Sequence, residues 1–135
     1  MTVVVDTSAL YALLDEDDVN HIEAVRGWTR LLARESPTAH AYVVLETSAL
    51  VQRQLGMKAV ERLHRGLLPI VRVTMVDTST HQRAVERWLA QRLRGLSLVD
   101  VTSFVVMRDR GLDHAFAFDD DFVREAFSLW DDHAG

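Results

Sequence analysis

The order of apolar runs along the chain is the feature that most limits its fold. Short apolar runs of strand length alternate with longer runs that have helical periodicity. The predicted strands are residues 2–5, 38–40, 70–74, 115–118 and 127–130. The predicted helices are residues 8–14, 19–35, 41–55, 58–67, 78–94 and 97–111, with a helical turn at 121–126. Because strands that alternate with helices need crossover connections, this order predicts a parallel sheet with helices on both faces, a three-layer α/β/α sandwich.

The length of 135 residues suits one domain, which we expect to span residues 1–135. Thr78 or Ser79 is expected to cap the helix that starts there, and Ser97 the next helix. The helix at 19–35 carries an apolar stripe made of Ile22, Val25, Trp28 and Leu32. The spacing of the stripe indicates the face that packs on the core, although the same stripe could form a groove for a partner helix or a dimer contact.

Several classes of protein are excluded by what the sequence lacks. It contains no cysteine, which rules out disulfide scaffolds, thiolate zinc sites and cysteine nucleophiles. The valine run at the N-terminus is interrupted at Asp6, so it does not resemble a signal peptide. No stretch approaches the roughly 18 apolar residues of a membrane span. We therefore expect a cytoplasmic protein without a membrane segment.

The net charge of −5 at first argues against a nucleic-acid partner. However, Lys58 is the only lysine among 15 basic residues, and arginine is the residue suited to bidentate phosphate contacts. Arginines recur every four residues in two predicted helices, as Arg26, Arg30 and Arg34 and as Arg83 and Arg87. Such rows could hold an RNA backbone, or they could be solvated faces that pair with neighbouring glutamates.

Four separated acidic residues occupy positions where they could converge. Asp6 and Asp119 each follow a predicted strand, and ligand sites of open parallel sheets lie beyond the carboxyl ends of the strands. Asp100 lies in the first turn of one helix, and Glu46 lies in the second turn of another. Carboxylate oxygens are ligands that Mg²⁺ prefers, and Mg²⁺ supports phosphodiester hydrolysis.

Each of these acids also has a purely structural interpretation. Asp6 and Asp119 could be helix N-caps, and Ser97 with Asp100 could form a variant capping box. Glu46 could be a solvated helix residue. Taken singly, the residues favour these structural roles, whereas their common placement favours one site.

Three segments carry a family resemblance. VVVDTSAL near the N-terminus, YVVLETSAL in the third predicted helix and SLVDVTSFVVMRDRGLDHAFAFDDDF near the C-terminus resemble the motifs of PIN-domain ribonucleases, the family that includes VapC-type toxins. The resemblance implies that divalent metal, Mg²⁺ or Mn²⁺, is bound and water activated by four residues: Asp6, Glu46, Asp100 and Asp119. It also implies that Ser8 supports the first aspartate and that Asp121 is an additional acid.

The resemblance further implies an endoribonuclease that serves as the toxin of a type II toxin–antitoxin pair. Its expected partners are an RNA substrate, a cognate antitoxin and a second copy of the chain in a homodimer. The alternative is a non-catalytic RNA-binding or regulatory domain that keeps the PIN fold. A phosphoryl-acceptor domain fits less well, because Lys58 is not at a strand end and Ser8 stands where a phosphatase needs a second aspartate.

Overall fold

The computed structural model describes residues 1–92 and 95–130, and within them five parallel strands form one sheet of order β3-β2-β1-β4-β5. The strands are β1 (Thr2–Val5), β2 (Ser36–His40), β3 (Arg72–Thr74), β4 (His114–Phe116) and β5 (Ser128–Leu129). The helices are α1 (Thr7–Leu14), α2 (His21–Arg34), α3 (Ala41–Leu55), α4 (Met57–Arg62), α5 (Thr78–Gln91), α6 (Leu98–Arg110) and α7 (Asp121–Arg124). A π-helical turn, η1 (Leu63–Leu67), and a 3₁₀ turn, η2 (Leu68–Ile70), join α4 to β3.

The strand order reverses beside β1. The chain places β2 and β3 on one side of β1 and then returns to place β4 and β5 on the other side. Val4 and Val5 of β1 pair in register with Ala115 and Phe116 of β4. Their carboxyl ends therefore lie next to each other at the switch point, where open α/β sheets place their ligand sites.

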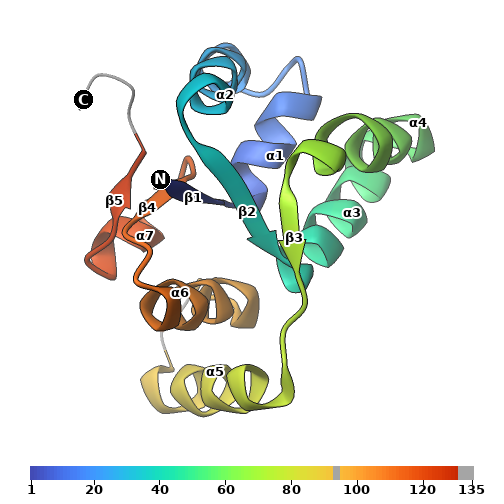
Figure 1. Cartoon of the computed structure of the whole chain (residues 1–135). Helices are drawn as coiled ribbons and strands as arrows, with labels where there is room; N and C mark the ends of the chain where they lie inside the picture. The colour runs from blue at the N-terminus through green and yellow to red at the C-terminus, as the bar shows by residue number, and fades with distance from the viewer. Residues whose placement is uncertain (93–94, 131–135) are drawn as a thin grey trace.

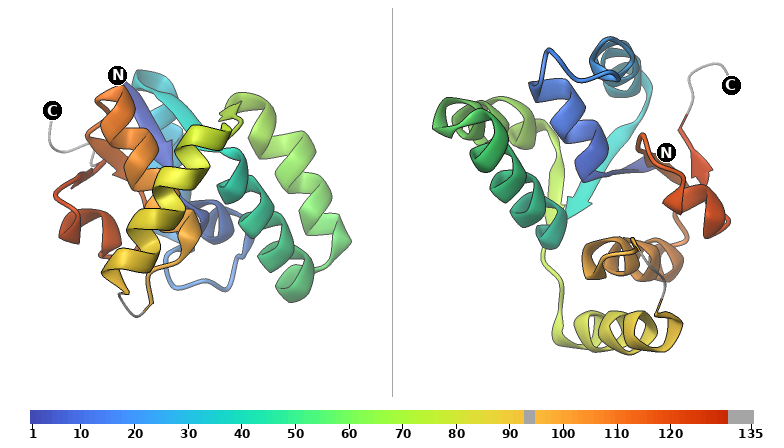
Figure 2. Two further views of the ribbon diagram at one scale, coloured as in Figure 1. Left: turned by 90° about the horizontal axis from the view of Figure 1, so that it is seen from below. Right: turned by 180° about the vertical axis from the view of Figure 1, so that it is seen from behind.

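The alternating side chains of β1 separate two layers of helices. Val3 and Val5 are buried in a core shared with α1, α2, α3 and α4, whereas Val4 faces the opposite side and packs with Phe104 of α6. Helix α5 packs on the outer side of α6 (Figures 1 and 2). The predicted three-layer sandwich with a parallel sheet is confirmed. None of the helices in the described ranges is long and apolar enough to cross a membrane.

The predicted buried stripe of α2 was right for Trp28, which is buried, and for Leu32, which is partly buried against the core, but wrong for Ile22 and Val25. The residues of this helix that are buried are Ala24, Trp28 and Leu31. Ile22 is 66% exposed and Val25 is 43% exposed, so both point largely toward solvent. The helix is rotated relative to the prediction because its smallest residues approach the sheet, and a side chain on Gly27 would meet the ring of Phe116 at 3.0 Å.

Several element boundaries also differ from the predictions. The cap of α5 is Asp77, whose carboxylate accepts a hydrogen bond from the Thr80 amide at 2.8 Å, and not Thr78 or Ser79. The end predicted for this helix, near residue 94, lies outside the described residues. Strand β3 starts at Arg72 because the segment after Pro69 continues as a 3₁₀ turn. Strand β4 ends at Phe116, so Asp119 lies in the loop after the strand.

Candidate active site

Asp6 is the most deeply buried carboxylate of the candidate site. It directly follows β1 and caps the N-terminus of α1, where its Oδ2 accepts hydrogen bonds from the Ser8 amide at 3.1 Å and the Ser8 hydroxyl at 2.6 Å. The side chain is 3% exposed. The capping role predicted as the structural alternative is therefore present, but a solvated cap would not need such burial.

Ser8 connects the two strands of the switch point. While its hydroxyl donates to Asp6, its oxygen accepts a hydrogen bond from the Phe118 amide at 3.0 Å. The Asp6 amide in turn donates to the carbonyl of Phe116 at 3.0 Å. These bonds hold the loop after β4 against the start of α1, and they bring Asp119 toward Asp6.

Asp100 belongs to a complete capping box at the start of α6. Its Oδ2 accepts from the Ser97 amide at 3.1 Å and the Ser97 hydroxyl at 3.0 Å, while its own amide donates to the Ser97 oxygen at 3.1 Å. The bonds fix the direction of the carboxylate. Because α6 lies against the sheet face that carries Val4, its N-terminus places Asp100 beside the carboxyl end of β1.

Glu46 lies in the second turn of α3, as predicted, and is half-buried. The neighbouring Thr47 donates a buried hydrogen bond to Thr7 at 3.0 Å, so α3 is fastened to α1 next to Asp6. The two threonines were not recognised from the sequence as site residues. A signal was available, because each directly follows a site acid in the repeated pattern acid-Thr-Ser-Ala-Leu at residues 6–10 and 46–50.

Asp119 and Asp121 lie at the start of the segment that forms α7. The Asp119 carboxylate accepts a hydrogen bond from the Asp121 amide at 3.1 Å. Asp119 is not the N-cap of α7, which is Asp120, so that structural alternative was wrong. Asp121 pairs with Arg124 at 3.6 Å and so carries a partly compensated charge.

The five acids act on one another electrostatically. Burial raises the pKa of Asp6 from its usual 3.8 to about 8, although the Ser8 hydroxyl lowers it, and the charges of Asp119 and Asp100 raise it further. Burial also raises the pKa of Asp100 to about 6, with contributions from Asp121 and Glu46. The pKa of Asp121 is raised by burial and then by Asp119. The structure thus brings all the predicted acids into one acidic cluster, defined as Asp6, Glu46, Asp100, Asp119 and Asp121.

The acidic cluster is not a preassembled metal cage. No three acidic or histidine side chains within residues 1–92 and 95–130 are arranged so that they already hold a metal ion. The chemistry of the donors nevertheless suits a cation, because crowded carboxylates with raised pKa values repel one another and a cation relieves the repulsion. Mg²⁺ in particular keeps several waters and needs only one or two carboxylates as direct ligands.

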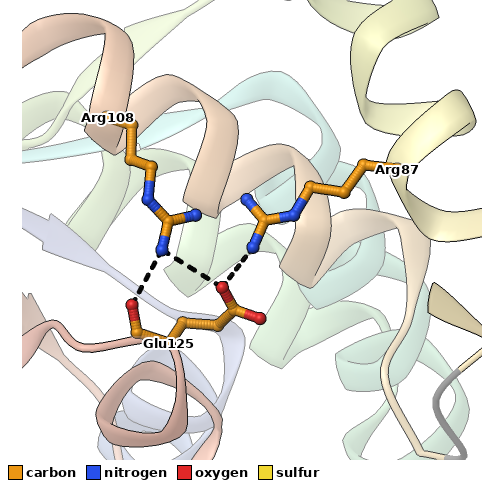
Figure 3. A network of polar contacts seen from close by, with 3 residues as sticks. All are labelled: Arg87, Arg108 and Glu125. Atoms are coloured by element: carbon orange, nitrogen blue, oxygen red, sulfur yellow. Dashed lines mark hydrogen bonds and ion pairs between the residues drawn. The ribbon is translucent and has the colours of Figure 1, made fainter. Parts of the chain in front are cut away.

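A partly buried ion-pair network fixes the segment that carries Asp119 and Asp121. The carboxylate of Glu125, the residue at the end of α7, forms ion pairs with Arg87 of α5 and Arg108 of α6 (Figure 3). Arg108 also donates to the Glu125 carbonyl at 2.9 Å. Since Glu125 directly follows α7, these ion pairs attach the segment with Asp119 and Asp121 to α5 and α6.

The predicted arginine rows separate into two groups. Arg26 and Arg30 line an open groove that also includes Asp119, whereas Arg34 does not contribute to it. Arg83 pairs with Asp109, and Arg87 pairs with Glu125, so this row is structural.

His40, the residue directly before α3, is a buried structural histidine. Its Nδ1 accepts from the Tyr42 amide at 3.2 Å and caps α3, and its Nε2 lies 2.8 Å from the Ser103 hydroxyl of α6. Burial lowers the pKa of His40 to about 4, which keeps the ring neutral. It joins the helix that carries Glu46 to the helix that carries Asp100.

Comparison with protein families matches residues 3–128 to the PIN domain. Among curated proteins, the chain is 36% identical over 128 residues to the 23S rRNA-specific endonuclease VapC20 of Mycobacterium tuberculosis, in each of two strains. The alignment covers 93% of this chain and 95% of the relative.

Three solved structures share the fold of this chain. The crystal structure of the M. tuberculosis VapC20, described as a sarcin–ricin loop cleaving toxin, matches with a TM-score of 0.83 and 33% identity over 93% of this chain and 95% of that one. FitAcB from Neisseria gonorrhoeae matches with a TM-score of 0.69 and 17% identity, covering 97% of each chain. VapBC2 from Rickettsia felis, bound to a promoter DNA fragment, matches with a TM-score of 0.72 and 9% identity over 96% of this chain and 98% of that one.

Proposed function

The chain belongs to the PIN-domain family and is an endoribonuclease, and from this premise we propose that the acidic cluster is its catalytic site. The observation that carries the proposal is the convergence of five carboxylates from distant parts of the sequence at the switch point between β1 and β4. A folded protein tolerates such repulsion at a functional site more readily than elsewhere.

The residues of the cluster would hold Mg²⁺ or Mn²⁺, with Asp6 and Asp100 as the central ligands. When bound, the cation supplies charge neutralisation at the scissile phosphate and lowers the pKa of a water molecule. Ser8 and Ser97 orient the two aspartates through hydrogen bonds, so the carboxylates need little rearrangement. Glu46 and Asp119 complete the ring of acids on either side, and Asp121 is a supporting acid.

The substrate that we propose is a structured ribosomal RNA of the kind cut by the M. tuberculosis relative, the sarcin–ricin loop of 23S rRNA. An identity of 36% over nearly the whole of both chains supports a shared substrate class. The enzyme acts as the toxin of a type II toxin–antitoxin pair in the cytoplasm, where ribosomes are found.

We propose a cognate antitoxin and a homodimer as the protein partners. A basic antitoxin side chain would be attracted to the acidic cluster for Coulombic reasons. Leu45 of α3 and Leu89 of α5, which are 70% and 55% exposed, are apolar positions that a second copy would cover in such a dimer. Sedimentation of the purified chain tests the dimer.

The test of the enzymatic proposal is cleavage of an RNA stem-loop with the sarcin–ricin sequence by the purified protein. We expect cleavage with Mg²⁺ or Mn²⁺, none with a chelator, and a loss of at least about 100-fold in Asp100→Asn. Asp113→Asn is the matched control, since Asp113 is an exposed acid outside the cluster.

Two outcomes would contradict the proposal. Full activity in Asp100→Asn would show that the acidic cluster is not required for RNA cleavage. Binding of RNA without any cleavage would instead support the alternative of a non-catalytic RNA-binding PIN domain. The variants are compared only after circular dichroism shows that each is folded.

A further inference from the structure

An open groove of about 590 Å³ adjoins the acidic cluster at Asp119. One wall is α2, which contributes Arg26 and Arg30. The other wall consists of the end of β4, the loop after it and the residues around β5, with aromatic side chains at Phe118 and Trp130. The groove therefore joins two arginines, an aromatic surface and one edge of the catalytic site.

Gly27 is the point where α2 and the aromatic wall of the groove lie closest together. A glycine inside a helix costs roughly 1 kcal/mol relative to alanine, and here it lies in the middle of α2. A side chain at this position would meet the Phe116 ring at 3.0 Å and the Trp130 ring at 3.9 Å. The missing side chain lets the rings of Phe116 and Trp130 lie close to α2.

The aromatic wall is held in place by the core. Phe116 stacks on Trp28 at a centroid distance of 6.2 Å and contacts Phe118 and Trp130 edge-to-face at 5.7 and 6.1 Å. The Trp130 amide donates to the Ala115 carbonyl at 2.8 Å. Phe118 and Trp130 are only half-buried, so part of each ring remains available to a ligand.

The groove carries charges of both signs. Arg26 and Arg30 of α2 can contact phosphates, whereas Glu23, Asp119 and Asp120 are the acids of the lining. Arg26 and Arg30 are separated by four residues, about 6 Å along the helix axis, so their guanidinium groups can contact successive phosphates. Arg26 makes no ion pair with any residue in the described ranges. Asp119, which belongs to the acidic cluster, also lines the groove.

We propose that this groove binds the single-stranded RNA segment next to the scissile phosphate, with phosphates at Arg26 and Arg30 and a nucleobase against Phe118 or Trp130. The inference rests on the proposed ribonuclease function and adds the path of the substrate across the enzyme. Any base can stack on an aromatic ring. The groove should therefore increase the affinity for RNA and fix its position, and it should discriminate little between bases.

The binding test uses the fluorescein-labelled sarcin–ricin stem-loop and the Asp100→Asn background, so that the RNA stays intact. In this background, the double variant Arg26→Ala/Arg30→Ala should raise the Kd at least about 10-fold and reduce the slope of log K against log salt by about 1.4, the value for two single-strand phosphate contacts. The matched control is Arg53→Ala/Arg62→Ala, which removes the same charge from exposed arginines of α3 and α4 outside the groove.

The aromatic part of the proposal is tested by comparing Trp130→Phe with Trp130→Leu. The phenylalanine variant should retain RNA affinity, whereas the leucine variant should lose about 5-fold or more. If leucine lowers thermal stability, Phe118→Leu provides a second measurement on the same wall.

Cleavage kinetics distinguish this proposal from the proposed function. In the wild-type background the arginine double variant should raise KM with little change in kcat. If the wild type cleaves RNA but the double variant matches its control in Kd, salt slope and KM, the groove proposal is overturned and the ribonuclease stands. The same result combined with impaired antitoxin inhibition would assign the groove to a protein partner. If the wild type does not cleave, the proposed function fails, while the binding measurements still decide whether RNA occupies the groove.

Discussion

Asp6 combines a structural and a chemical role that place opposite demands on its charge. As the cap of α1 it accepts two hydrogen bonds from Ser8, which favour the carboxylate. Burial and the charges of Asp119 and Asp100 favour the protonated form. The net rise in the pKa of Asp6 indicates that repulsion and burial prevail in the absence of a cation.

Replacing Asp6 with asparagine should therefore separate stability from activity. Asparagine keeps an oxygen that can accept from the Ser8 amide but removes the buried charge. We expect the cation-free variant at pH 7.5 to be more stable than the wild type by about 1–3 kcal/mol and to have lost RNA cleavage. Urea unfolding with a chelator measures the stability. A variant less stable than the wild type would show that the charge of Asp6 supports the fold.

His40 should make the protein sensitive to acid. Its folded-state pKa of about 4 lies below the usual 6.5, so the unfolded chain binds a proton between these values that the folded protein does not bind. The contribution of His40 to stability is thus complete above pH 6.5 and is lost as the pH falls toward 4.

The variant His40→Asn tests this dependence. Asparagine can still cap α3 by accepting from the Tyr42 amide, but it cannot span to Ser103. We expect a loss of about 1–3 kcal/mol at pH 7 and a smaller difference from the wild type at pH 5, measured by urea unfolding. A difference that does not change with pH would mean that His40 is not buried in its neutral form.

At the scale of elements, the parts with local signals were predictable from the sequence. The valines of β1 followed by Asp6, and the capping pattern from Ser97 to Asp100, fix their elements within a few residues. The buried face of α2 was predicted only in part, because the rotation of the helix depends on Phe116, which is distant in sequence and packs against Gly27. The orientation of a helix on a sheet is decided by such contacts and not by its apolar residues alone.

In the candidate site, too, the features with local sequence signals were predictable and the long-range contacts were not. The acids were identifiable as single residues, and their placement at strand ends and helix starts indicated a common location. The bond from the Phe118 amide to Ser8, which joins residues 110 positions apart, has no local signature. Because the sequence gives no sign of this hydrogen bond, the prediction placed Asp119 directly after β4, whereas the residue lies in the loop after the strand.

The attachment of α7 to the outer helices gives a prediction for this element. Glu125→Gln removes the charge shared by Arg87 and Arg108, whose side chains also lie over the rings of Phe104 and Phe127. We expect a loss of about 1–3 kcal/mol in unfolding free energy and reduced cleavage, because Asp119 and Asp121 lose their anchor.

The matched control for this change is Asp109→Asn. It breaks the exposed pair with Arg83 and should cost less than about 1 kcal/mol without affecting cleavage. Equal effects of the two variants on stability and cleavage would show that Glu125 does not position the segment.

At the scale of the whole molecule, the fold gathers like charges that are far apart in the chain. Strands β1 and β4 bring Asp6 and Asp119 to the same edge, and α3 and α6 add Glu46 and Asp100 from opposite layers of the sandwich. This convergence lowers the free energy of unfolding of the whole domain, because the acids come from four separate segments of the chain. A ligand that neutralises the cluster should therefore stabilise the entire fold.

The stabilisation by Mg²⁺ should increase with pH. The pKa values of Asp6 and Asp100, about 8 and about 6, lie above their unfolded value of 3.8. For such groups the stability contribution is fully present below pH 3.8 and is lost as the pH rises through the folded-state values. The cation-free protein should therefore lose stability between pH 6 and 8, whereas the cation-bound protein should not. Thermal unfolding with Mg²⁺ or a chelator should show a Tm difference that widens over this range and is much smaller in Asp6→Asn. A difference independent of pH, or unchanged in Asp6→Asn, would place the cation away from the acidic cluster.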